Sequence, residues 1–139
     1  MRGIEALDPA AIASAEARLA AILRACADAD ASVWFLPPLT EAAARGFWRR
    51  AAASVTAGDR VLLGAWADGT LAGTVTLDLA TPPNQPHRAE IAALLVHPAF
   101  RRRGLAKALM AGAETEARRL GRRLLTLNTR AGGWMEELY

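Results

Sequence analysis

Cysteine is nearly absent from this sequence. Cys26 is the only one among 139 residues, so no intrachain disulfide can form, and no Cys or His lies nearby to build a zinc finger. Long apolar runs are also missing, because no stretch approaches the roughly 18 residues of a membrane span. Charges interrupt the N-terminus where a secretion signal would need an apolar segment. We therefore expect a cytoplasmic protein that binds no membrane and no metal.

Two common phosphate-binding patterns are missing as well. Neither the Gly-x-x-x-x-Gly-Lys-Ser/Thr pattern of a P-loop nor the Gly-x-Gly-x-x-Gly pattern of a dinucleotide fold occurs. Aromatic residues make up 6% of the chain, and none lies between Phe100 and Trp134. Because that basic region has no ring to stack on bases, the sequence argues against a nucleic-acid-binding module.

The charge is unevenly distributed along the chain. The net charge is +3, yet residues 101 to 130 hold nine basic side chains against two acidic ones. Such a local basic block predicts a bound anion, with phosphate as the first candidate. The length suits one compact domain, which we expect to span residues 1–139.

Periodicity and turn signals predict an α/β fold with a mixed sheet. Asp8 and Thr40 are expected helix caps, and Asp68-Gly69 between two β-like runs predicts a hairpin. Alternation over residues 74–79 predicts one apolar and one polar strand face, whereas the apolar run 90–96 predicts a strand covered on both faces. The expected order is helix 9–29, helix 40–58, strands 60–67, 71–80 and 90–96, helix 105–121, strand 124–128 and a short helix 136–139.

The stretch from Leu94 to Met110 carries the strongest functional signal. After a buried strand, Arg101, Gly104 and Ala106 form the pattern Arg-x-x-Gly-x-Ala at the start of a helix. The unpaired amides and the dipole of a helix N-terminus favour phosphate, and the two small residues let a ligand approach the backbone. The pattern predicts a diphosphate site, with an Arg-rich solvated loop as the alternative. Four basic side chains belong to it: Arg101, Arg102, Arg103 and Lys107.

At these residues the sequence resembles the GCN5-related N-acetyltransferase (GNAT) superfamily, whose signature is Arg/Gln-x-x-Gly-x-Gly/Ala after such a strand. Segments 35–39, 84–90, 95–98 and 126–132 are similar to the tabtoxin-resistance type of small-molecule acetyltransferases. The resemblance implies acetyl-coenzyme A as donor and a small primary amine as acceptor. It also implies that the pantetheine arm pairs with the backbone of one strand and the diphosphate meets loop amides. The matching positions are Leu94, Leu95 and Val96 for the arm, and Arg102, Arg103, Gly104, Leu105 and Ala106 for the diphosphate.

Two residues match catalytic positions of the family. Glu90 corresponds to the general base that deprotonates the substrate ammonium through water; a solvated strand end is the alternative, and His87 and Asp78 are reserve candidates. Tyr139 corresponds to a tyrosine that protonates the departing thiolate, with a ring packed under a terminal helix as the alternative. The resemblance thus implies direct attack by a neutral amine. We expect Cys26 to take no part in it.

The resemblance also bears on the acceptor site. It implies that Trp34, Phe35 and Leu36 wall this site, although an apolar run beside two prolines is also typical of a core. Asn128 stands where relatives more often have Asp, which leaves hydrogen bonding but no base.

The family fold continues with two strands after the position of Tyr139, and we expect them to be missing here. The fifth strand would then have an exposed edge that a homodimer can cover. A non-catalytic coenzyme A-binding remnant of the family remains the main alternative function.

Overall fold

The computed structural model describes residues 3–29, 40–79, 88–122 and 124–127. Within them, five strands form one sheet in the order β1-β2-β3-β4-β5. Neighbours are antiparallel from β1 to β4, and β5 runs parallel to β4. The predicted mixed sheet is therefore confirmed. The strands are β1 (Ile4–Ala6), β2 (Arg60–Ala67), β3 (Thr70–Asp78), β4 (Arg88–Val96) and β5 (Leu124–Leu127).

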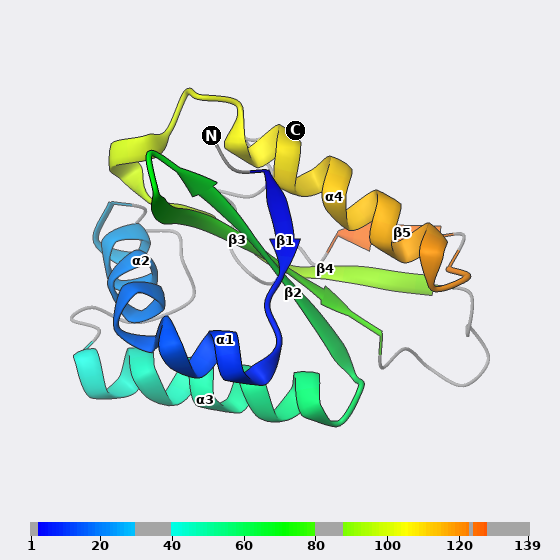
Figure 1. Ribbon diagram of the computed structural model, residues 1–139, viewed down its shortest axis with the longest axis horizontal. Coiled ribbons are helices and arrows are strands. Elements are labelled where there is room, and N and C mark those ends of the chain that lie inside the picture. The colour runs from blue at the N-terminus through cyan, green and yellow to red at the C-terminus, as the bar shows by residue number, and fades with distance from the viewer. Residues whose placement is uncertain (1–2, 30–39, 80–87, 123, 128–139) are drawn as a thin grey trace.

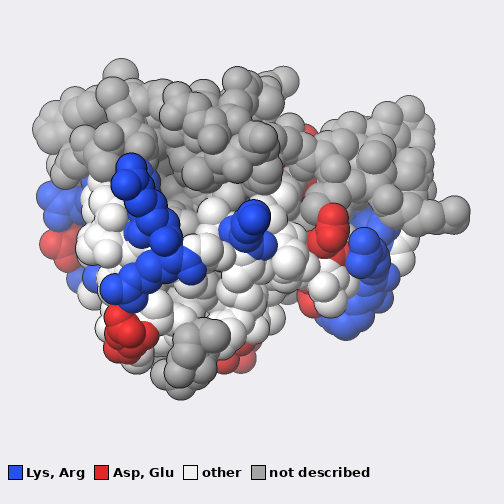
Figure 2. Space-filling view, turned by 90° about the horizontal axis from the view of Figure 1, so that it is seen from above, with Lys and Arg blue, Asp and Glu red and all other residues white. Residues whose placement is uncertain are grey.

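Helices cover both faces of this sheet (Figure 1). On one face, α4 (Leu105–Arg119) packs against β2, β3 and β4. The other face carries α1 (Pro9–Ser14), α2 (Glu16–Ala29) and α3 (Glu41–Thr56). A single turn of 3₁₀ helix, η1 (Pro98–Phe100), leads from β4 toward α4. Seen from above, basic and acidic side chains form separate groups among uncharged residues (Figure 2). No described helix is long and apolar enough to cross a membrane.

Local signals in the sequence mark several element boundaries correctly. The side chains of Asp8 and Thr40 each accept a hydrogen bond from the backbone N–H three residues later, as N-caps do. Asp68 and Gly69 have φ angles of 55° and 76°. Two successive residues in the left-handed region make the tight turn that suits the twist of a hairpin. The predicted caps and hairpin are confirmed.

Two features of the N-terminal part differ from the prediction. The helix expected over residues 9–29 is divided at Ala15, whose φ and ψ are −99° and 10°. No Gly or Pro marks this bend. Ile12 before it and Leu19 after it are both buried, and α1 packs against α3 and α2, so the bend lets both segments bury their apolar side chains. The strand β1 was not expected, because three residues are too few to show a period; it pairs with β2 through Ile4 and Ala65.

The predicted polar face of β3 is wrong. Thr74 and Thr76 are buried, with 0% and 4% of their surface exposed. Gly73 lies against Leu109 of α4, and successive residues of a strand alternate between faces, so the threonines face α1–α3. That helical layer covers the side of β3 that the sequence suggested was open to water.

The buried hydroxyl of Thr74 has no hydrogen-bond partner among the described residues. We expect Thr74→Val to raise the free energy of unfolding by about 1 kcal/mol, because the variant keeps the shape and removes an uncompensated polar group. Urea denaturation measures this change. The control Thr74→Ser keeps the hydroxyl and loses a methyl group, so it should be less stable than wild type. A Thr74→Val protein less stable than wild type would show that the hydroxyl is satisfied.

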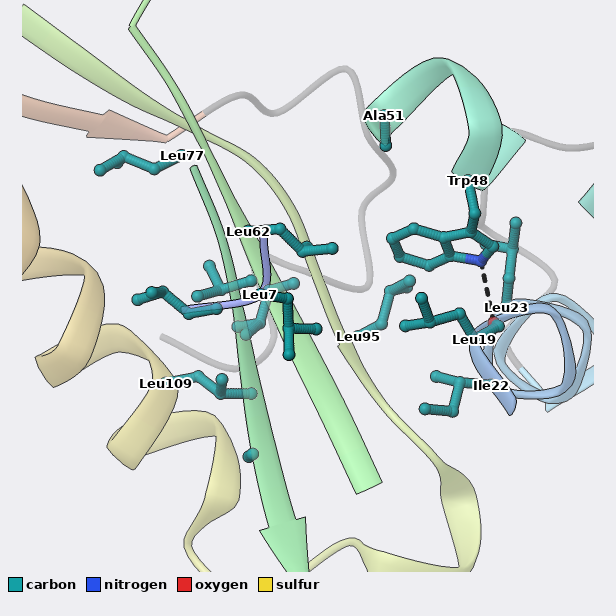
Figure 3. Packing of buried hydrophobic residues seen from close by; sticks show 14 of the residues in the cluster. Leu7, Leu19, Ile22, Leu23, Trp48, Ala51, Leu62, Leu77, Leu95 and Leu109 are labelled. Carbon is teal, nitrogen blue, oxygen red and sulfur yellow. Dashed lines mark hydrogen bonds between the residues drawn. The ribbon is translucent and has the colours of Figure 1, made fainter. Parts of the chain in front are cut away.

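The largest buried side chain of the core is Trp48, on α3. Its indole Nε1 donates a hydrogen bond of 2.9 Å to the carbonyl oxygen of Leu19 on α2. Figure 3 shows this bond and the leucine and isoleucine side chains that surround the ring. The indole therefore joins α2 and α3 while filling the space between these helices and the sheet.

Candidate active site

The candidate site begins where β4 and β5 stop pairing. Their register joins residues 88–91 of β4 to residues 124–127 of β5. Beyond Ile91, the described residues place no strand beside β4 on that side. On the other side, Thr76 of β3 pairs with Ala93 and Leu77 with Ile91, so Ala92 is one extra residue, a β-bulge. Within the described part of the chain, the second half of β4 therefore has an unpaired edge next to the described end of β5.

The hydrogen-bonding groups of this half-strand alternate in direction. The N–H of His97 donates to the Ala72 oxygen at 2.8 Å, while Val96 is opposite Gly73. In an antiparallel ladder this makes Val96 a member of a non-hydrogen-bonded pair and Leu95 a member of a hydrogen-bonded one. Leu94 and Val96 consequently direct their backbone groups away from β3, and Leu95 directs its groups toward β3. Of the three strand residues predicted to hold the pantetheine arm, two present backbone groups to the edge.

The loop after β4 is held by its own side chains. His97 caps η1, since its Nδ1 accepts the N–H of Ala99 at 3.0 Å, and its ring meets the Phe100 ring edge to face. Burial lowers the pKa of His97 from its ordinary value, and the nearby charges of Arg18 and Arg101 lower it further. The imidazole is therefore kept neutral, as a hydrogen-bond acceptor must be.

The lowered pKa of His97 predicts that the stability of the folded protein depends on pH. Because its pKa is lower in the folded protein, protons bind the unfolded chain more readily, and the free energy of unfolding should fall as the pH drops below about 6.5. Urea denaturation between about pH 7.5 and 5.5 tests this window. In His97→Asn the side-chain oxygen can still accept the Ala99 N–H but does not titrate, so the slope should flatten. If the unfolding free energy changed equally with pH in both proteins, His97 would not be the responsible group. Glu16 and Glu116 have pKa values lowered by their arginine partners, and they affect stability at more acidic pH.

The Arg-x-x-Gly-x-Ala segment forms an open N-terminus of α4. Gly104 is the N-cap residue with a φ of 79°, and no side chain caps the helix. The first intrahelical bond runs from the Ala108 N–H to the Gly104 oxygen, which leaves the amides of the preceding turn without helical acceptors. A Cβ placed on Gly104 would meet no atom within 4 Å. A free row of N–H donors beside open space fits a diphosphate group.

Basic side chains surround this helix start. Arg102, Arg103 and Lys107 are all exposed. Arg103 donates to the Asp68 carboxylate at 2.8 Å and lies 5.1 Å from the centre of the Phe100 ring. Arg101 differs from the others, because its Nε bonds inward to the Val96 oxygen at 3.1 Å. Three of the four predicted cations therefore face the solvent around the predicted diphosphate site.

A pocket of about 290 Å³ borders the first turn of α4, with Gly104, Leu105 and Ala108 in its lining. β1 and the end of β2 line it with apolar groups, and Arg103 and Asp68 stand among its lining residues. Because these two side chains form an ion pair with each other, the pocket offers a diphosphate little charge. The edge of β4 and the amides of α4 suit that group better.

Glu90 lies in the first half of β4, on the other side of the bulge. It is half-buried, opposite Asp78 of β3 and Thr126 of β5. The structure thus brings the predicted base next to one reserve candidate. Asp78 has an arginine close by, with Arg60 Nη2 at 3.8 Å. Both carboxylates lie on the α1–α3 face, because Asp78 follows Thr76 by two residues along β3.

The structure does not describe six of the predicted site residues: Trp34, Phe35, Leu36, His87, Asn128 and Tyr139. The expected homodimer contact through β5 stays a prediction. No group of three or more metal-ligating side chains occurs in the described part of the chain.

Sequence reasoning missed one residue that touches this region. The Cys26 thiol, on α2, donates to the Val96 oxygen at 3.3 Å. Seventy positions separate the two residues, and the sequence around Cys26 shows only an apolar helical stripe. No local signal reports a contact of this kind.

Fold and site together define a domain that can hold an elongated anionic ligand along the edge of β4 and at the N-terminus of α4. The profile of the acetyltransferase (GNAT) family matches residues 20–138. The chain belongs to this family, and acetyl-coenzyme A is the acetyl donor that the family uses.

Three solved structures show the same fold. A ribosomal-protein-alanine N-acetyltransferase from Brucella melitensis biovar Abortus 2308 is 22% identical with a TM-score of 0.70, over 98% of this chain and 86% of that one. An aminoglycoside acetyltransferase from an uncultured soil metagenomic sample is 22% identical with a TM-score of 0.68, over 100% and 89%. The PaiA N-acetyltransferase from Thermoplasma acidophilum, in complex with coenzyme A, is 21% identical with a TM-score of 0.57, over 87% and 76%. The first two names give different acceptors, so the fold does not set the acceptor. The likeness to the tabtoxin-resistance branch stays a prediction.

Proposed function

We propose that the chain transfers the acetyl group of acetyl-coenzyme A to the primary amine of a small molecule. The observation that carries this proposal is the edge of β4 at Leu94 and Val96, followed in the chain by the open amides at Gly104. An extended ligand with amide groups can pair with such an edge as an added strand does. Its phosphates then reach a helix N-terminus surrounded by arginine and lysine.

The residues that would hold the donor follow from this arrangement. Backbone groups of Leu94 and the N–H of Val96 would bind the pantetheine arm, and the amides of residues 102–106 would bind the diphosphate. Arg102 and Lys107 add positive charge there, whereas Arg103 is paired with Asp68. Bound acetyl-coenzyme A supplies an activated acetyl thioester.

The chain's own groups would handle the protons. Glu90 removes the proton of the acceptor ammonium, and Tyr139 donates a proton to the thiolate that leaves. A half-buried carboxylate suits the first role, and a phenol that is neutral near pH 7 suits the second. By the family resemblance, Trp34, Phe35, Leu36 and Asn128 border the acceptor. Asp78 is the described reserve base and lies directly opposite Glu90.

Two measurements test the function. Calorimetry should show acetyl-coenzyme A binding that weakens as salt rises, because exposed arginines meet its phosphates. A screen of amines that detects released thiol should then find turnover with small amines in preference to a basic peptide. Lack of coenzyme A binding at millimolar concentration would refute the proposal. Binding without transfer to any amine would favour the non-catalytic alternative, and tight binding of random DNA or RNA would favour a nucleic-acid module.

A further inference from the structure

One arginine of the cofactor loop is turned away from the solvent. The Arg101 side chain is half-buried; its Nε donates to the Val96 carbonyl oxygen at 3.1 Å, and its Nη2 lies 3.8 Å from the Cys26 sulfur. The Cys26 thiol donates to the same carbonyl at 3.3 Å. These contacts join α2, the last residue of β4 and the loop that leads to α4.

The Val96 carbonyl group in this cluster determines how far a ligand can pair with β4. Val96 directs its backbone groups away from β3, toward the edge where the donor's arm is proposed to bind. A carbonyl oxygen has two lone pairs, and here the guanidinium and the thiol both bond to it. The Val96 oxygen is therefore engaged before any ligand arrives, and strand-like pairing along β4 must end there.

Helix α2 supports the same loop at a second place. Arg18 lies two turns before Cys26 on α2, and its Nε donates to the Leu71 oxygen at 2.8 Å. The Arg18 guanidinium also lies 5.9 Å from the centre of the Phe100 ring in η1. The loop that presents the α4 amides thus rests on α2, and the Cys26 contact fixes its first residues.

We propose that Arg101 and Cys26 are positioning residues for the donor, an inference that rests on the proposed function. They hold the Val96 carbonyl, set the point where the pantetheine arm leaves β4, and keep the following amides aimed at the diphosphate. In this arrangement Arg101 acts through its fork of donors, and the exposed cations supply the charge that the phosphates meet.

Substitutions can distinguish a role of these residues in loop geometry from a role in charge. Arg101→Lys keeps the charge, but a lysine has one ammonium group and no Nε, so it does not reproduce the two contacts. Cys26→Val removes the thiol donor at similar volume, whereas Cys26→Ser keeps a donor. Lys107→Met is the matched control, because it removes one exposed cation from the first turn of α4.

Coenzyme A binding by calorimetry at low and high salt is the first test. Arg101→Lys and Cys26→Val should each weaken binding roughly tenfold, as expected for the loss of a hydrogen bond to a charged or buried group. Their salt dependence should equal that of wild type, and the double variant should be no weaker than the weaker single one. Cys26→Ser should bind nearly as wild type does. Lys107→Met should weaken binding and reduce the salt dependence.

Hydrogen exchange of the ligand-free protein is the second test, and it is independent of cofactor binding. The amides of residues 102–106 should exchange faster in Arg101→Lys and Cys26→Val, while the amides of α3 should not change. In Lys107→Met both regions should match wild type. The inference would be overturned if the loop amides exchanged at the wild-type rate in both Arg101→Lys and Cys26→Val. It would also be overturned if Arg101→Lys bound coenzyme A as tightly as wild type does. Failure of wild type to bind coenzyme A would instead refute the proposed function.

Discussion

Replacing Glu90 with glutamine is expected to lower turnover at least about 100-fold while leaving coenzyme A affinity almost unchanged. A positioned general base contributes about 10²- to 10⁴-fold to a rate, and an amide cannot accept the proton of the ammonium. Glu90 lies in the first half of β4, on the other side of the Ala92 bulge from the residues that would bind the donor. The change should therefore affect the proton transfer and not donor binding.

Steady-state kinetics with a saturating amine, followed from about pH 6 to 9, measure this effect. Asp78→Asn is the matched control, because it removes the same kind of charge from the position opposite Glu90. We expect it to lower turnover less than about tenfold. Full turnover in Glu90→Gln at every pH would refute the base assignment, and a larger loss in Asp78→Asn would transfer the role to Asp78.

Replacing Trp48 with alanine is expected to lower the free energy of unfolding by about 3–5 kcal/mol, the usual range for removing a fully buried large aromatic side chain. Trp48 is 0% exposed, and closing the cavity would require α2 and α3 to shift against the strands on which they pack. The substitution also removes the bond from the indole to the Leu19 oxygen. Since typical domains are stable by about 5–15 kcal/mol, this loss is a large part of the total.

Urea denaturation of the ligand-free protein gives the size of this effect. Trp48→Phe is the control; it keeps most of the buried apolar surface and lacks the N–H, so we expect a loss of about 1–2 kcal/mol. A drop below about 1 kcal/mol in Trp48→Ala would mean that the helices repack around the vacancy.

Features that depend on a few neighbouring residues could be predicted from the sequence. The caps at Asp8 and Thr40, the hairpin at Asp68-Gly69 and the open helix start at Gly104 each depend on conformational preferences of single residues. Glycine and aspartate tolerate positive φ where other residues are strained. These signals are strong because no distant contact is needed to produce them.

Features that depend on contacts between distant residues could not be predicted. The burial of Thr74 follows from the helical layer above it, and the inward turn of Arg101 follows from the positions of Val96 and Cys26. The sequence marks Arg101 as a cation but does not show which way it points. Likewise, β1 exists because β2 offers it an edge to pair with. In each case the conformation or burial of the residue is determined by a contact that is distant in the sequence.

Ala92, the extra residue in β4, determines how this strand tolerates insertions and deletions. Side chains alternate between the two faces of a sheet along a strand. One extra residue therefore moves all side chains on one side of it to the opposite face, relative to those on its other side. Glu90 shares a face with Thr76 only because Ala92 is unmatched on β3. Without that offset, a regular β4 would turn the carboxylate toward α4, into the opposite layer of the molecule. The two halves of β4 therefore have opposite parity. Deleting Ala92 would leave Glu90 and Ile91 on their present faces, because the remaining residues already pair one to one with β3.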